Sequence, residues 1–469
     1  MARRVRTFLT LAGVATTLLA TANCGTSASQ DAPDSTAGAS MGLSTDQGLS
    51  ALIADISPAE IRATDSVLVS FGTRQTLSDT MSATRGIGAA RHYLFAKFSG
   101  YSKACGGCLH VEYDPAMVQV RRFPKQPTVN VVNVLAWLPG RDAKRVVVIT
   151  GHYDSCLCAV DQTDDTSDAP GADDDASGTS DVVELARVFS KHYPKGLKAT
   201  LLFAAVAGEE QGLLGSTHLA QRLHDEGYTV VGDMSDDLDG NVTASNGRTD
   251  STTMRIYSAD PDNTPSRELS RYAVALGSLY NPNFHILDVL RVDRIGRGTD
   301  DEPFVALGEP GIRTTERMEA LDRQHSPRDV FADVDFTYSA KIARLNAAVM
   351  GSLGLAPAAP DSVRARRQRP LGQQWQLSWK PVSDATGYEV LVRPTTSPTW
   401  QRVIPVGKVT SYTLDEQLDD LWAAVRSVDA QGHTSLAVVV PPVRRRRSAR
   451  RPARAAGGNG RGGARRAAR

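Results

Sequence analysis

Acidic and histidine side chains stand directly beside several apolar or helical segments of this sequence. His152 and Asp154 follow the apolar run "VVVIT", and Glu209 and Glu210 follow "LLFAAVA". Further carboxylates occupy "PGADDDASG" and "SDDLDG", and His325 follows "RTTERMEALDRQ". Singly, such residues are commonly helix caps or structural histidines. Together, histidine nitrogens and carboxylate oxygens form the ligand set of a hydrolytic zinc site, which we therefore predict.

The segments that must position these side chains alternate between strand and helix. Apolar runs at 128–140, 144–150 and 198–208 predict strands, and the apolar spacing of 180–193 predicts a helix. Such alternation predicts an α/β fold with a mixed, largely parallel sheet flanked by helices. Open α/β sheets bind ligands outside the carboxyl ends of their strands, which is where these acidic and histidine residues stand.

Three motifs in this order, "GHYDS", "PGADDDASG" and "FAAVAGEEQGLLGS", resemble the zinc peptidase family M28 of secreted bacterial aminopeptidases. A later "D-x-x-G" and "QHSPRDV" extend the resemblance over about residues 65–355. The stretches "VSFGTRQTLSD" and "TRGIGAARHY" are similar to the segment that precedes the core in one bacterial branch. The resemblance implies a zinc exopeptidase fold, two Zn²⁺ ions and peptide substrates.

The resemblance also implies a role for each matching residue. The implied zinc ligands are His152, Asp174 as the bridge between both ions, Glu210, Asp237 and His325. Asp154 would hold the ring of His152, as an outer carboxylate does for a metal-bound histidine. Glu209 would be the general base that takes a proton from the attacking water. In this family the peptide bond after the bridging aspartate is cis.

Two positions depart from the family pattern. The aspartate ligand is expected in a "D-apolar-apolar-G" stretch, and Asp237 fits best, although Asp239 replaces an apolar residue. Asp233, followed by Met234 but by no glycine, is the alternative ligand. Asp301 stands where the family commonly has a histidine, which removes a donor near the substrate.

The N-terminal part predicts export. Arginines before an apolar stretch, and an A-x-A site at 20–22, indicate a signal peptide over 1–22 and a secreted or cell-envelope protein. A lipid anchor at Cys24 is the less favoured alternative. A disordered spacer is expected over 23–50 and the catalytic domain over 51–357.

Short predicted strands follow residue 357. The stretch "LSWKPVSDATGYEVLVRP", with Trp379 and Tyr388, resembles a fibronectin type III module and predicts a β-sandwich over 358–443. Residues 444–469 hold eleven arginines and no acid, so the formal net charge of +1 leaves −10 on the rest of the chain. This asymmetry argues against a nucleic-acid partner, whereas the sandwich and the basic, disordered tail could contact a cell surface or polysaccharide.

Four of the five cysteines form two close pairs, Cys105 with Cys108 and Cys156 with Cys158. An exported protein can keep disulfides. A C-x-C bridge is expected to be strained, so we expect the two loops to be cross-linked to each other. Local pairing and free thiols are the alternatives.

These features predict an exported two-zinc exopeptidase, and specifically an aminopeptidase that removes N-terminal residues from peptides. A glutaminyl cyclase, related to the same family and using one zinc, is one alternative. A catalytically inactive surface-binding protein is another, because Asp301 and the irregular "SDDLDG" depart from the family pattern.

Overall fold

The computed structural model describes residues 41–121, 125–369 and 372–441. The predicted signal peptide, residues 23–40 of the predicted spacer and the arginine-rich tail lie outside this part of the chain. None of the helices in the described part combines the length and the apolarity that a bilayer-spanning segment needs.

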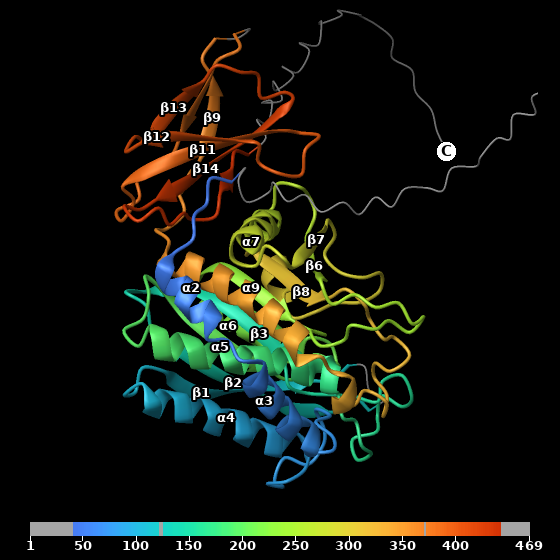
Figure 1. Ribbon diagram of the computed structural model, residues 1–469. Helices are drawn as coiled ribbons and strands as arrows, with labels where there is room; N and C mark the ends of the chain where they lie inside the picture. The colour runs from blue at the N-terminus through green and yellow to red at the C-terminus, as the bar shows by residue number, and fades with distance from the viewer. Residues whose placement is uncertain (1–40, 122–124, 370–371, 442–469) are drawn as a thin grey trace, which may run out of the picture. The chain divides into compact units, whose positions relative to one another are not determined.

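An eight-stranded sheet forms the centre of the fold, in the order β1-β2-β4-β3-β5-β8-β6-β7 (Figure 1). β3 pairs in parallel with β4 and β5, and β5 with β8, whereas β1, β2 and β4 are joined by antiparallel pairings. The predicted mixed, largely parallel sheet is therefore confirmed. The strands are β1 (His110–Gln119), β2 (Thr128–Leu138), β3 (Asp142–His152), β4 (Ala199–Val206), β5 (Thr229–Asp236), β6 (Thr253–Ser258), β7 (His285–Val289) and β8 (Gly311–Glu316).

Helices cover both faces of this sheet. Alternate residues of β2 point to opposite faces, so Val134 and Ala136 join one core while Leu135 and Trp137 join the other. The first core is covered by α2 (Gln47–Ala54), α3 (Pro58–Ser70), α4 (Gly86–Ala104), α5 (Gly178–His192), α7 (Pro265–Tyr280) and α9 (Phe336–Leu355). The second is covered by α6 (Leu214–Asp225) and α8 (Glu302–Ala306).

Three neighbouring parallel strands end at one edge of the sheet. In the register, His152 at the end of β3 pairs with Val206 at the end of β4, and Thr150 pairs with Ser235 near the end of β5. α5 begins at the same edge, where a Cβ on Gly151 would lie 2.8 Å from the backbone of Gly178. Residues that follow these strands therefore meet at this edge, as the sequence predicted.

The residues after α9 form two antiparallel sheets, ordered β13-β10-β9 and β12-β11-β14-β15. Leu377 and Leu414 from the first sheet share one buried core with Tyr388, Val390 and Val425 from the second, as the two sheets of a sandwich do. The strands are β9 (Arg364–Arg367), β10 (Trp375–Ser378), β11 (Gly387–Pro394), β12 (Arg402–Gly407), β13 (Ser411–Leu414), β14 (Leu421–Val428) and β15 (Val438–Val439).

The predicted disordered spacer over 23–50 extends too far. α2 begins at Gln47, and the carboxylate of Asp46 caps it by accepting a hydrogen bond from Leu49 N at 2.8 Å. The prediction was wrong for residues 41–50 because a small-residue composition concealed a capped helix whose apolar side packs into the core.

The first described residues contact the C-terminal strands. Met41 lies in a small core with Leu391 and Trp400, and its carbonyl oxygen accepts a hydrogen bond from Arg426. Trp400 Nε1 also donates to Glu268 Oε2 on α7 at 2.8 Å. Segments from both ends of the described chain thus pack together.

The disulfides are local, so the predicted cross-link between the two loops is wrong. Cys105 bonds to Cys108 and Cys156 to Cys158, with Cα–Cα distances of 5.6 and 5.2 Å. Cys108 lies against the carbonyl oxygen of Ser190 near the end of α5, whereas Cys156 follows β3 at the edge where α5 begins. At roughly 1.5 Å per residue, the intervening length of α5 is about 18 Å, which no single disulfide spans.

Candidate metal centre

Asp174 lies between two histidines. Its Oδ1 is 3.2 Å from His152 Nε2, and its Oδ2 is 2.9 Å from His325 Nε2. The two carboxylate oxygens therefore face different histidines, which is the arrangement of a carboxylate that bridges two ions. The Asp174–Asp175 peptide bond is cis, as the resemblance implied.

Each histidine also faces a second carboxylate. Glu210 Oε2 is 3.2 Å from His325 Nε2, and Asp237 Oδ1 is 3.8 Å from His152 Nε2. The structure thus brings together all five residues that the sequence predicted as ligands, although they come from segments far apart in the chain.

Asp237 is held from its other side. Thr299 Oγ1 donates to Asp237 Oδ2 at 3.1 Å, and Arg313 Nη2 lies 3.2 Å from the same oxygen. Burial opposes ionisation, but the charge of Arg313 and the interactions with His152 together outweigh it and lower the pKa of Asp237 to about 2. Asp233 lies deeper in β5, where burial and the nearby Asp301 raise its pKa. Its carboxylate is not part of the group that His152, Asp174 and Asp237 form. The geometry therefore favours Asp237 over Asp233.

The side chains fit zinc. His152 Nε2 and Asp237 Oδ1 are buried and make no hydrogen bond, although together with Asp174 they present atoms within 4.8 Å of one another. Buried polar atoms normally find a partner, so atoms that face each other unpaired indicate a shared ion. Imidazole nitrogen and carboxylate oxygen both bind zinc, at about 2.0–2.2 Å.

Other side chains hold the segment that carries Asp174. The carboxylate of Asp329 accepts hydrogen bonds from the N–H groups of Asp173 and Asp174, both at 2.9 Å. Gln324 Nε2 donates to Asp174 Oδ2 at 2.7 Å. Both Gln324 and Asp329 belong to the segment around His325, so this segment supplies a ligand and also orients the bridging carboxylate.

Arg74 holds the loop before Asp174 and was missed at the sequence level. Its buried guanidinium donates to the carbonyl oxygens of Pro170 (2.6 Å), Gly171 (2.8 Å) and Tyr153 (2.8 Å). Arg74 lies between α3 and α4, and its stretch "VSFGTRQTLSD" contains no periodicity or spacing that marks one residue. Arg313 was missed too, although an arginine inside the buried strand β8 is a detectable signal.

Asp154 lies against the His152 ring and also holds the turn after β4. Its Oδ1 is 3.7 Å from His152 Nδ1, whereas its main-chain carbonyl oxygen is closer, at 3.2 Å. The carboxylate accepts hydrogen bonds from Gly208 N (2.8 Å) and Glu209 N (3.3 Å), and Thr76 Oγ1 donates to its Oδ2 at 3.1 Å. Asp154 therefore holds the turn after β4 with its carboxylate, and both its carboxylate and its carbonyl group face the His152 ring.

Glu209 lies beside the ligands and lines a cavity of about 290 Å³. The residue is half-buried, and burial raises its pKa well above the usual range. The same cavity is lined by Asp174 and Glu210, by Arg297 before α8 and by Glu302 at the start of α8. The site is therefore open to a small substrate group.

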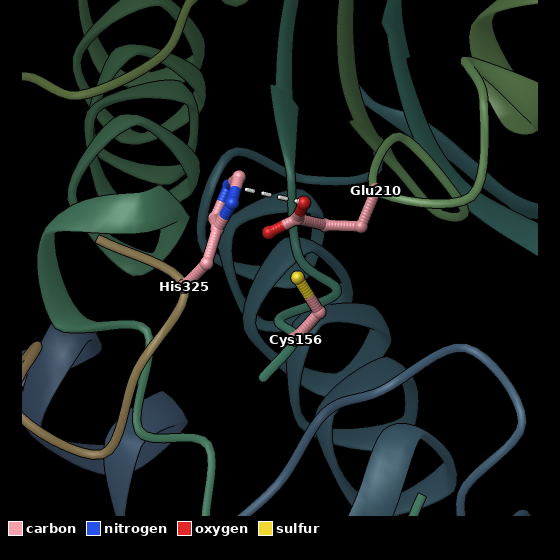
Figure 2. A group of neighbouring side chains, drawn as sticks. All are labelled: Cys156, Glu210 and His325. Carbon is pink, nitrogen blue, oxygen red and sulfur yellow. Dashed lines mark ion pairs between the residues drawn. The ribbon is translucent and has the colours of Figure 1, made fainter. Parts of the chain in front are cut away.

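The Cys156–Cys158 disulfide borders the His325 side of the site. Figure 2 shows the Cys156 sulfur beside the ion pair of Glu210 and His325, and atoms of these three residues lie within 4.8 Å of one another. Ala159 N in the same loop donates to His325 O at 3.2 Å. Since His325 has a left-handed backbone with φ of 57°, an uncommon conformation outside glycine, this loop helps to hold it.

The family follows from comparison with known proteins. The family model described as "Peptidase family M28" matches residues 133–350. A protein of Pyrenophora teres named "Probable zinc metalloprotease" is 36% identical over 426 residues, covering 84% of this chain and 86% of its own. The chain belongs to peptidase family M28. A similarly named M28 relative of Leptosphaeria maculans is 36% identical over 424 residues, covering 84% of this chain and 96% of its own.

This M28 chain is a zinc metallopeptidase, which confirms the predicted family and enzyme class. Its fold is similar to that of the LapA aminopeptidase of Legionella pneumophila, with a TM-score of 0.53 and 21% identity, over 70% of this chain and 78% of that one. LapB of the same organism has a TM-score of 0.52 and 21% identity, over 66% and 75%. The two similar metalloproteases are fungal, whereas the sequence motifs suggested a bacterial branch.

Proposed function

We propose that this M28 peptidase is an exported aminopeptidase that holds two zinc ions. The observation that carries the proposal is the position of Asp174, whose two oxygens face His152 and His325 separately. Asp237 is the second carboxylate beside His152, and Glu210 is the second carboxylate beside His325. Each of the two proposed zinc sites then contains one histidine, one carboxylate of its own and one oxygen of Asp174.

Zinc, when bound, would supply Lewis acidity toward water and the scissile carbonyl group. Glu209 would accept a proton from the attacking water and deliver it to the leaving amine. Asp154 would keep the backbone of Glu209 in place throughout, because it accepts hydrogen bonds from the turn.

An aminopeptidase must also bind the free α-ammonium group of its substrate. We assign this task to Glu302, which is half-buried and lines the same cavity as the zinc ligands. Burial raises the pKa of Glu302, and the nearby Asp293 adds to this effect. A cationic substrate group would relieve both penalties by forming a charge-assisted hydrogen bond with the carboxylate.

The first test compares leucyl-p-nitroanilide with its N-acetylated form, using the mature protein with and without a zinc chelator. We expect chelator-sensitive cleavage of the free-amine substrate alone, and close to two zinc ions per chain by elemental analysis. Equal cleavage of both substrates would contradict the aminopeptidase assignment. Cyclisation of an N-terminal glutamine without peptide hydrolysis, by a protein holding one zinc, would support the cyclase alternative instead.

The assignment of Glu302 is tested by Glu302→Gln. Loss of a charge-assisted hydrogen bond, about 1.5–3 kcal/mol, raises KM for the free-amine substrate by roughly 10- to 100-fold. Glu309→Gln is the matched control, because Glu309 is also half-buried with its pKa raised by burial but does not line the cavity. An unchanged KM in Glu302→Gln would contradict the assignment.

The same proposal includes export through residues 1–22 and a spacer role for a fibronectin type III-like domain at 358–443. Mass determination of the N-terminus of secreted protein tests the first part, with residue 23 expected as the first residue. The basic tail at 444–469 is proposed to contact anionic lipid or polysaccharide, and sedimentation with anionic vesicles, with and without the tail, tests this contact.

A further inference from the structure

Three buried carboxylates form a second cluster next to the zinc ligands. Asp181 lies in the first turn of α5, Asp236 is the last residue of β5, and Asp239 lies in the following loop. All three are completely buried, and each presents an oxygen within 4.8 Å of the others. None of them belongs to the ligand set described above, and nothing in the proposed hydrolysis uses them.

Hydrogen bonds satisfy only part of this cluster. Ser339 Oγ donates to Asp181 Oδ1 at 2.8 Å, and Asn346 Nδ2 donates to Asp236 Oδ1. The remaining oxygen of each of these carboxylates has no hydrogen-bond partner, and the same holds for both oxygens of Asp239. The amide oxygen of Asn346 is also buried and unpartnered. Unpaired oxygens of this kind are rare in protein interiors because each one has lost its hydration.

The strongest charged neighbours of the cluster are themselves carboxylates. The charged groups that act on Asp181 and Asp239 from outside the cluster include the carboxylates of Asp65, Asp175 and Glu184, which only add repulsion. Arg344 interacts with Asp181 electrostatically, but its Nη2 donates to the carbonyl oxygen of Ile56 at 3.1 Å. Three neighbouring buried carboxylates therefore need a cation or protons to be stable.

We propose that Asp181, Asp236 and Asp239 together bind one calcium ion, at a site separate from the zinc centre. The available ligands are all oxygen atoms, which favours a hard cation over zinc. The facing oxygens lie within 4.8 Å of one another, a separation that calcium, which binds oxygen at about 2.3–2.6 Å, can bridge. Magnesium usually keeps several water ligands and is seldom bound by protein groups alone, so a completely buried cluster favours it less.

The site accounts for a departure noted in the sequence. Asp239 stands where the family pattern has an apolar residue, and a bound ion explains why a charged group is tolerated there. Asp236 and Asp239 lie on either side of Asp237 in the chain, so one ion binding both would fix the backbone that carries this zinc ligand. The calcium ion thus acts as a structural support for the zinc centre.

Elemental analysis of the full chain is the direct test. The protein is prepared with zinc and millimolar calcium, passed into calcium-free buffer, and analysed for both metals. We expect one calcium per chain in addition to zinc, because a completely buried ion exchanges slowly. Absence of calcium would overturn the proposal and indicate that the cluster holds protons. This readout does not depend on peptidase activity, so it fails or succeeds separately from the proposed function.

Asp181→Asn is the matching variant, since Asp181 lies farther along the chain from a zinc ligand than Asp236 and Asp239, which flank Asp237. We expect loss of the calcium with zinc retained. Asp233→Asn is the control: Asp233 is equally buried on β5 and has two unpartnered oxygens, but lies outside the cluster. Retention of calcium in Asp181→Asn, or its loss in Asp233→Asn, would contradict the assigned position.

Thermal unfolding gives a second measurement in case Asp181→Asn does not fold. With zinc saturating, calcium is expected to raise the Tm of the wild-type protein in a concentration-dependent way, because a ligand of the native state stabilises it. Equimolar magnesium should raise the Tm less. Equal responses to both ions, or no response to calcium, would count against a calcium site.

Discussion

Replacing Arg74 by methionine removes the guanidinium that holds the loop before Asp174 and keeps the aliphatic stem. The carbonyl oxygens of Pro170, Gly171 and Tyr153 then lose their donors, which lie at 2.6–2.8 Å in the native protein. The buried Asp65 also loses the positive charge that acts on it.

The expected cost follows from these losses. Each carbonyl left buried without a partner costs about 1–3 kcal/mol. Because such terms are not additive, we expect Arg74→Met to lower the free energy of unfolding by about 3–5 kcal/mol. Zinc affinity should fall by roughly 10- to 100-fold, as it does when an outer partner of a metal ligand is removed.

Urea unfolding of the zinc-loaded protein and zinc competition with a chromophoric chelator measure the two effects. Arg85→Met is the control, because Arg85 lies on the same segment but its ion pair with Asp168 is largely exposed. An exposed pair contributes about 0–1 kcal/mol. The positioning role of Arg74 is refuted if the free energies of unfolding of Arg74→Met and Arg85→Met differ by less than about 1 kcal/mol and the two variants bind zinc equally well.

Three further predictions concern catalysis, packing and pH. Glu209→Gln should lower kcat by on the order of a hundredfold or more with zinc content unchanged, and unaltered kcat would exclude Glu209 as the base. Gly178→Ala should cost about 1–3 kcal/mol in urea unfolding, because its Cβ would lie 2.5 Å from Asp236 O, whereas Gly100→Ala in open space should be neutral or stabilising. Burial opposes ionisation of Asp429, but hydrogen bonds from Lys198 and His433 lower its pKa to about 2 from 3.8. The ionised Asp429 stabilises the fold by about 2 kcal/mol above about pH 4, and this contribution is lost as the pH falls toward 2. The difference in free energy of unfolding between the wild type and Asp429→Asn should therefore shrink as the pH falls over that range.

The central strands were predictable because they are buried on both faces. Residues 146–149 of β3 are completely buried, which leaves a continuous apolar run in the sequence. β1 was not predicted, since it lies at the edge of the sheet, is largely exposed and contains Pro115. Strands thus escape sequence analysis where one face needs no apolar side chains.

The zinc ligands were predictable for a related reason. Parallel strands deliver the residues that follow them to one edge, so His152 and Asp237 could be grouped from strand ends and motifs alone. The groups that orient them could not be grouped in this way. Arg74 and Thr76 reach the site through the packing of an N-terminal segment, and Asp154 holds a turn as well as facing the His152 ring. Such contacts depend on tertiary structure that no local pattern encodes.

The packing of Met41 against the C-terminal strands has a consequence for the order of events during synthesis. The small core of Met41, Leu391 and Trp400 joins a residue that is synthesised early to strands that are synthesised much later. The hydrogen bond from Arg426 to Met41 O closes the same loop of chain. Met41 therefore cannot complete its packing until these C-terminal strands have emerged from the ribosome. A nascent chain stalled before residue 391 leaves Met41 without this core.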